Sequence, residues 1–102
     1  MALNGYTRRY PALKLLDEEA LEQIHQGVLR VLWTTGVHME HRGALEILER
    51  AGCEVDYDDW RVRYPPGLVE EALRRCPSSF QVKTRDPSKS IVLGGNALHV
   101  LP

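Results

Sequence analysis

Residues 17–36 read DEEALEQIHQGVLRVLWTTG. Asp17 is a favourable N-cap residue, and Glu18 and Glu19 complement the positive end of a helix dipole. Apolar residues then recur at helical spacing, namely Leu21, Ile24, Val28, Val31 and Leu32. Gly36 suits the left-handed conformation that ends many helices. The stretch therefore predicts a first helix that starts after Asp17, runs to about residue 34 and carries an apolar stripe.

Two further helices are predicted downstream. Residues 42–51 carry an apolar face at helical spacing, and Gly52 follows as a stop signal. The first and second helices are expected to form a helical hairpin. Pro66 is well suited to the first turn of a third helix, which runs to about Arg75 and alternates acidic and basic residues on a solvated face.

Strand patterns occupy the remaining segments. Residues 53–56 and 60–64 flank a turn-rich triplet at 57–59, which predicts a short β-hairpin. Its candidate inward side chains are Val55, Trp60, Val62 and Tyr64. Residues 80–84, 91–93 and 98–101, separated by turns at 86–88 and 94–96, predict a three-stranded antiparallel meander. The predicted fold class is therefore α+β: a helical hairpin, a short β-hairpin, a third helix and then the meander.

The domain organisation follows from this pattern. Residues 1–16 show no clear period and are interpreted as an N-terminal arm, whereas residues 17–102 form one α+β domain. The last predicted strand is apolar and ends at Pro102 without a polar fringe, so we expect more protein to follow it.

Composition excludes several classes of protein. The 102 residues are 43% apolar and 26% charged, which is close to the globular average and argues against disorder. A net charge of -1 with interleaved signs argues against a broad surface for nucleic acid or anionic lipid. The chain shows neither a run of about 20 apolar residues nor a secretory signal pattern, so we expect a cytoplasmic location.

The histidines do not form a convincing reactive group. His38 and His41 have the spacing of a metal-ligand pair, but no second pair exists, and one of them is better explained as a cap of the second helix. His25 lies at the edge of the first helix's apolar stripe and His99 alternates with apolar neighbours in the last strand, where it could face a cavity, solvent or an interface. We predict no catalytic, cofactor-binding or metal-binding residue.

Other motifs are also interpreted structurally. Cys53 and Cys76 are isolated thiols, typical of a reducing compartment, and are expected to be inert and unpaired. The triplet 94–96 (Gly-Gly-Asn) precedes a strand rather than a helix, so it is a turn and not a phosphate loop. Basic residues on predicted strands could form a weak nucleic-acid patch: Arg61, Arg63, Lys83, Arg85 and Lys89.

Short motifs along residues 15–102 resemble, in order, the N-terminal region of the trimethylamine:corrinoid methyltransferase family. They are Glu18-Glu19-Ala20-Leu21-Glu22-Gln23-Ile24-His25, Gly36-Val37-His38, Ala44-Leu45, Ala51-Gly52-Cys53-Glu54-Val55-Asp56, Arg61-Val62-Arg63-Tyr64-Pro65, Leu68-Val69-Glu70-Glu71-Ala72-Leu73, Cys76-Pro77-Ser78-Ser79-Phe80, Thr84-Arg85-Asp86-Pro87 and Leu93-Gly94-Gly95-Asn96. The chain departs from the family pattern at Trp33-Thr34-Thr35 and at Leu101.

The resemblance implies a large cytoplasmic enzyme of methylamine metabolism, including methanogenesis. Its (β/α)₈ TIM barrel moves a methyl group from trimethylamine, or from a quaternary amine such as glycine betaine, to the corrinoid (cobalamin) of a partner protein. The catalytic barrel would lie beyond Pro102, so no catalytic residue of the family maps onto this chain and no activity is expected of it alone.

Two hypotheses for the chain follow. The first is an accessory segment that supports the barrel or the enzyme's own oligomer. The alternative is a freestanding module that binds a protein or a nucleic acid.

Overall fold

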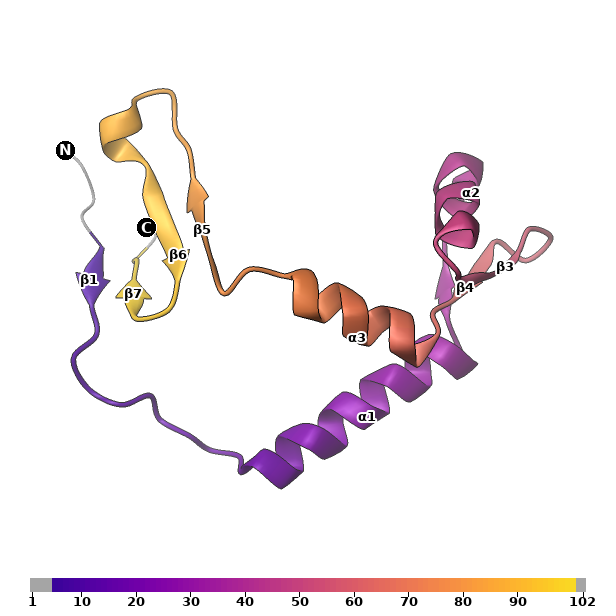
Figure 1. Ribbon diagram of the computed structural model, residues 1–102, viewed down its shortest axis with the longest axis horizontal. Helices are drawn as coiled ribbons and strands as arrows, with labels where there is room; N and C mark the ends of the chain where they lie inside the picture. The colour runs from indigo at the N-terminus through magenta and orange to yellow at the C-terminus, as the bar shows by residue number, and fades with distance from the viewer. Residues whose placement is uncertain (1–4, 101–102) are drawn as a thin grey trace. The chain divides into compact units, whose positions relative to one another are not determined.

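The computed structural model describes residues 5–100, which form an α+β fold with three α-helices and short antiparallel strands (Figure 1). The coarse fold class is therefore confirmed. The chain divides into two compact units. We call residues 15–75 the central unit, and residues 5–14 together with 76–100 the terminal unit. The division between an arm, 1–16, and a domain, 17–102, stays a prediction.

The helices of the central unit begin and end where local signals predict. Helix α1 (Glu18–Thr34) starts at Asp17, whose carboxylate accepts a 2.8 Å hydrogen bond from the Ala20 amide. Just beyond its C-terminal end, Gly36 has a φ of 72° and donates its amide to the Val31 carbonyl oxygen. Helix α2 (Arg42–Arg50) and helix α3 (Pro66–Arg75) likewise match the predicted ranges.

A three-stranded antiparallel sheet completes the central unit, in the order β2-β4-β3. Strands β3 (Glu54–Asp56) and β4 (Arg61–Arg63) form the predicted hairpin, and β2 (Val37–His38) adds a strand that local pattern did not predict. Val62 of β4 lies opposite Val55 on one side and Val37 on the other. The sheet therefore places a row of three valines at its centre.

Side chains from several elements build the core of this unit. Leu45 and Val62 have no exposed surface, and Cys53 is 6% exposed. Six partly buried residues pack against these three, namely Met39, Leu48, Val55, Tyr57, Tyr64 and Leu68. The prediction that Trp60 points inward is wrong. Trp60 ends the turn with a φ of 54° and is 36% exposed, because a left-handed residue leaves the alternation of the ladder.

The predicted pairing of α1 with α2 is also wrong. Helix α1 packs against α3, whereas α2 packs against β3 (Figure 1). Strand β2 lies between the first two helices in sequence and pairs with β4, which directs α2 onto the sheet. The helix pair α1–α3 is linked by a 2.9 Å contact between His25 Nε2 and Glu70 Oε1.

The buried face of α1 differs from the predicted stripe. Leu29 is only 5% exposed and Leu32 is partly buried, and both share a face with His25, which contacts α3. The other predicted stripe residues are about half exposed, namely Leu21, Ile24, Val28 and Val31. Helix α3 covers one side of the apolar surface, so the remaining side stays open.

Two small antiparallel pairs make up the terminal unit. Strands β5 (Ser79–Val82) and β6 (Ile91–Gly94) pair across a turn that contains the 3₁₀ helix η1 (Pro87–Lys89). Strand β7 (Ala97–Leu98) pairs with β1 (Tyr6–Thr7). The prediction of a three-stranded meander is therefore correct for its first two strands and wrong for the third.

Long-range hydrogen bonds explain the different partner of β7. The Arg8 amide donates to the Asn96 carbonyl oxygen at 2.8 Å, which ties residues of the predicted arm to the last turn. The His99 Nε2 donates a 2.7 Å hydrogen bond to the Val92 carbonyl oxygen of β6, so this oxygen already has a partner. Residue 101, the end of the predicted strand, and residues 1–4 of the predicted arm lie outside the described residues.

Across residues 5–100, none of the helices has the length and apolar character that crossing a bilayer would demand.

Candidate functional site

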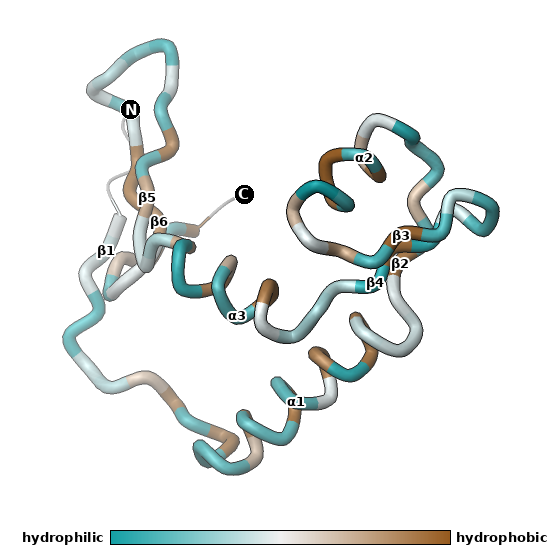
Figure 2. Tube along the Cα trace, turned by 45° about the vertical axis from the view of Figure 1, so that its right-hand side comes forward, coloured by the Kyte–Doolittle hydropathy of each residue, from teal (hydrophilic) through white to brown (hydrophobic). Residues whose placement is uncertain are grey.

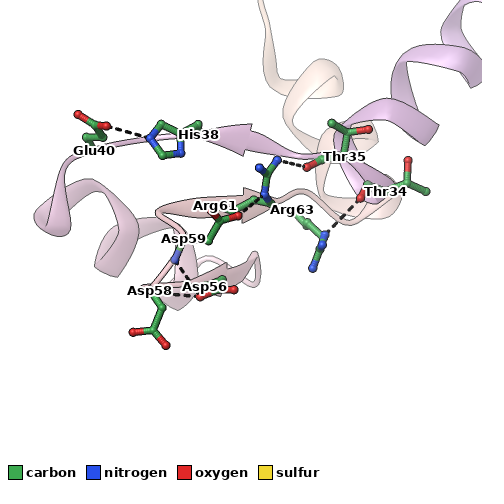
Figure 3. A network of polar contacts seen from close by, with 9 residues as sticks. All are labelled: Thr34, Thr35, His38, Glu40, Asp56, Asp58, Asp59, Arg61 and Arg63. Carbon is green, nitrogen blue, oxygen red and sulfur yellow. Dashed lines mark hydrogen bonds and ion pairs between the residues drawn. The ribbon is translucent and has the colours of Figure 1, made fainter.

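A polar network joins the end of α1 to the β3–β4 hairpin (Figure 3). Arg61 donates through Nη1 to the Thr35 carbonyl oxygen at 2.7 Å, and Arg63 donates through Nε to the Thr34 carbonyl oxygen at 3.3 Å. Arg61 also donates through Nε to Asp59 Oδ2 at 2.7 Å. The hydrogen bond and charge of Arg61 lower the pKa of Asp59. Both arginines therefore neutralise the negative end of the helix.

The remaining contacts of this network lie within the β3–β4 turn and the segment that follows β2. Asp56 Oδ1 accepts hydrogen bonds from the amides of Asp58 and Asp59, at 3.0 and 3.2 Å, which fixes the hairpin turn. His38 Nε2 lies 3.0 Å from Glu40 Oε1, and both side chains are exposed. The sequence could not predict the bonds from Arg61 and Arg63, because they span 26 and 29 residues.

The four histidines make separate contacts and do not form one group. His41 is the N-cap of α2, as one interpretation predicted: its Nδ1 accepts a 2.9 Å hydrogen bond from the Ala44 amide. His25 pairs with Glu70, and His99 Nε2 donates to a carbonyl oxygen. Within the described part of the chain, no three His, Cys, Asp or Glu residues gather closely enough to hold a metal ion.

The two cysteines are both free and have different surroundings. Cys53 is buried in the core of the central unit, and this burial raises the pKa of its thiol. A raised pKa lowers the fraction of reactive thiolate. Cys76 is exposed, just beyond the end of α3.

The residues of the predicted basic patch are divided between the two units. Arg61 and Arg63 belong to the central unit and bond to α1. Lys89 belongs to the terminal unit, where it lies 3.9 Å from Asp86. The nucleic-acid alternative therefore gains no support from these side chains.

An apolar pocket of about 480 Å³ opens in the central unit. It is lined by Leu32, Val37, Leu48, Ala51, Cys53, Tyr64, Leu68, Val69 and Ala72. Its polar side-chain groups are a thiol and the Tyr64 hydroxyl, whose pKa is raised by burial. The volume falls in the range of ligand pockets, but this lining offers apolar contact rather than acid–base chemistry. Sequence reasoning missed the pocket because four different elements and the segments between them contribute to its walls.

A smaller hollow of about 220 Å³ lies within the terminal unit. His99 lines it, together with residues of β1 and β6 and the Ser88–Ser90 turn. The His99 side chain was expected to point away from its apolar neighbours, toward a cavity, solvent or an interface. It does reach this hollow, and its Nε2 donates a hydrogen bond to the Val92 carbonyl oxygen.

The comparison with known proteins decides the family. The family model described as Trimethylamine methyltransferase (MTTB) matches residues 1–102. The chain belongs to the trimethylamine methyltransferase family. The resemblance seen in the ordered motifs is therefore confirmed.

Two relatives from Desulfitobacterium hafniense illustrate the range of the family. The chain is 41% identical over 79 residues to trimethylamine methyltransferase MttB of strain DSM 10664 / DCB-2, covering 78% of the chain and 16% of the relative. It is 29% identical over 92 residues to glycine betaine methyltransferase of strain Y51, covering 90% of the chain and 19% of the relative.

An archaeal relative shows the same relationship. The chain is 35% identical over 91 residues to trimethylamine methyltransferase MttB of Methanosarcina thermophila, covering 89% of the chain and 18% of the relative. The chain thus spans less than a fifth of the length of these family members.

Proposed function

We propose that this chain is the N-terminal accessory segment of a methylamine methyltransferase. The matched relatives are named for trimethylamine and glycine betaine, and one of these amine classes is the proposed substrate of the whole enzyme. The family resemblance implies a TIM barrel, a cytoplasmic setting and a separate corrinoid protein as methyl acceptor. The segment's own role is scaffolding: its α+β domain, 17–102, and its arm, 1–16, support the barrel or the oligomer.

An uncovered apolar face on the β5–β6 hairpin carries this proposal. Pairing sets Phe80 opposite Leu93 and Val82 opposite Ile91, so these four side chains share one face of the hairpin. Phe80 is 55% exposed and Val82 is 38% exposed. Figure 2 shows the hydrophobic colour on both strands. The opposite face carries Ser79, Gln81, Val92 and Gly94.

Such a hairpin needs a surface to lie on. A two-stranded ribbon is marginally stable in water, and a packed apolar face supplies the missing stabilisation. Covering the exposed part of Phe80 alone would contribute about 1 kcal/mol. A covering surface from the remainder of the methyltransferase fits the short span of this chain relative to its matched relatives.

The test uses the complete methyltransferase that contains this segment. Phe80→Asp places a charge on the apolar face, whereas Gln81→Asp places the same charge on the opposite face of the same strand. We expect Phe80→Asp to lower the thermal midpoint and the rate of methyl transfer to a corrinoid acceptor, and Gln81→Asp to leave both nearly unchanged. Equal effects of the two variants would contradict a covered hairpin face.

A second measurement concerns the chain by itself. Incubated with trimethylamine or glycine betaine and a corrinoid acceptor, residues 1–102 should transfer no methyl group. Turnover by this chain alone would overturn the accessory role.

A further inference from the structure

One face of α1 is apolar along its length and uncovered. Leu21, Ile24, Val28 and Val31 are 47%, 55%, 48% and 56% exposed. By helical geometry these four residues lie on one face, with the small residues Ala20 and Gly27 at its border. A Cβ added at Gly27 would meet no atom within 4 Å. A second helix could therefore approach the α1 backbone closely without burying a charge.

This face continues into the apolar pocket of the central unit. Leu32 borders the uncovered face on the helical wheel and also lines the pocket, and Val37 follows it in the pocket wall. At the opposite end of α1, Leu15 and Leu16 are 85% and 48% exposed. The central unit thus has an apolar cavity at one end of the face and exposed leucines at the other.

Leu15 is too far from the pocket of its own chain to fill it. Leu15 precedes the N-cap Asp17, and Leu32 lies near the C-terminal end of the same helix. A helix rises about 1.5 Å per residue, so roughly 20–25 Å separate the two sites. Leu15 can therefore enter such a pocket only in a second copy of the chain.

We propose that two copies of the chain pair through antiparallel α1 helices, about a two-fold axis at the level of Gln26. This register sets Leu21 of one copy opposite Val31 of the other, and Ile24 opposite Val28. The same register directs Leu15, which precedes α1, toward the C-terminal end of the second copy's α1, where its pocket opens. One patch thus serves both copies, as a two-fold interface requires.

The size of the surface suits a dimer. The six exposed side chains on each copy are Leu15, Leu16, Leu21, Ile24, Val28 and Val31. Together with the pocket walls, two copies would bury on the order of 1,000 Å² or more, the lower bound expected for a specific interface.

Sedimentation of the chain tests the pairing. Wild type should form a dimer at roughly 100 µM, a concentration that detects even weak specific association. Val28→Lys puts a charge on the uncovered face and should weaken dimerisation at least about tenfold. Gln26→Lys introduces the same residue on the opposite side of α1 and should leave the dimer intact. Circular dichroism of both variants checks that α1 still forms.

Cysteine cross-linking tests the antiparallel register. In a Cys76→Ser background, Leu21→Cys combined with Val31→Cys should form an intermolecular disulfide under mild oxidation. Leu21→Cys alone should not, because antiparallel pairing places the two copies of residue 21 about 15 Å apart along the axis. A disulfide from the single variant would overturn this geometry.

Two results would overturn the proposal as a whole. One is a monomeric wild-type chain at every concentration tested. The other is a monomeric complete polypeptide in which Val28→Lys lowers the thermal midpoint, because α1 would then be covered within one molecule. Phe80→Asp lies in the terminal unit and should not change dimerisation, so a failure of the scaffold proposal and a failure of this one are distinguishable.

Discussion

The central and terminal units use different means to hold their strands together. The central unit has a buried core of Leu45, Cys53 and Val62, onto which residues of α2, β3 and α3 pack. Within residues 5–14 and 76–100, every residue keeps part of its surface exposed to solvent. The terminal unit is joined by backbone ladders and by a few local hydrogen bonds, such as the one from His99 to Val92.

This difference indicates that the central unit is stable by itself, whereas the terminal unit depends on a partner surface for its stability. A buried apolar core stabilises the central unit through removal of its side chains from water. Exposed backbone ladders gain little net free energy, because water competes for the same hydrogen bonds. We therefore expect the central unit to fold by itself and the terminal unit to remain weakly stable until its apolar face is covered.

The largest expected contrast comes from large-to-small substitutions in the two units. Leu45→Ala removes a fully buried side chain from the central core and should lower the free energy of unfolding by about 2–5 kcal/mol. Phe80→Ala in the isolated chain should change it by less than about 0.5 kcal/mol, because Phe80 is already 55% exposed. Urea denaturation followed by far-UV circular dichroism measures both. Similar losses would remove the distinction between the units.

Glycine substitutions give a smaller contrast. Gly36 and Gly95 both have positive φ, 72° and 61°. A Cβ at Gly36 would collide with the Val62 carbonyl oxygen, whereas a Cβ at Gly95 has nothing within 4 Å. Gly36→Ala should therefore cost about 2–3 kcal/mol and Gly95→Ala no more than about 1 kcal/mol. Thermal unfolding of the two variants checks this order, and the reverse order would contradict it.

Removing a helix cap from each unit should have a smaller effect on stability and compares the same two units. His41 caps α2 in the central unit, and the Asp86 carboxylate caps η1 in the terminal unit by accepting from the Ser88 amide at 3.1 Å. His41→Ala should lower global stability by about 1 kcal/mol. Asp86→Ala should leave the main unfolding transition unchanged, since that transition reports the central unit. A comparable loss from both variants would show that the two units unfold together.

The smallest expected effect is the dependence of stability on acidic pH through Asp59. Arg61 lowers the pKa of Asp59 below its ordinary value of 3.8. A carboxyl with a lowered folded-state pKa adds stability above its unfolded pKa and loses it as the pH falls through the folded value. Asp59→Asn should therefore lower the thermal midpoint slightly near pH 7, and the difference should shrink as the pH falls below the ordinary pKa of 3.8. A difference that grows with acidity would contradict this assignment.

The sequence predicted the helices well because their signals are local. Asp17 and Gly36 mark the ends of α1 within a few residues of the bonds they make. The buried face of α1 was harder to predict, since Val28 and Leu29 are adjacent and equally apolar. Only the position of α3, set by contacts such as His25 to Glu70, decides that Leu29 is the covered residue.

Strand partners and the pocket depended on distant contacts. β2 has two residues, and its partner β4 begins more than 20 residues later, so alternation could not reveal it. The pairing of Tyr6 with Leu98 joins nearly opposite ends of the described chain. The apolar pocket follows from the same long-range packing, because its walls come from three helices, strand β2 and the segments beside them.

Amide hydrogen exchange tests the central claim most directly. In the isolated chain, amides of the central sheet, such as Val62, should exchange slowly, whereas those of the β5–β6 hairpin, such as Phe80 and Val92, should exchange close to the unprotected rate. In the complete methyltransferase, the hairpin amides should become strongly protected. Equal, strong protection of both units in the isolated chain would contradict the claim that the terminal unit needs another surface.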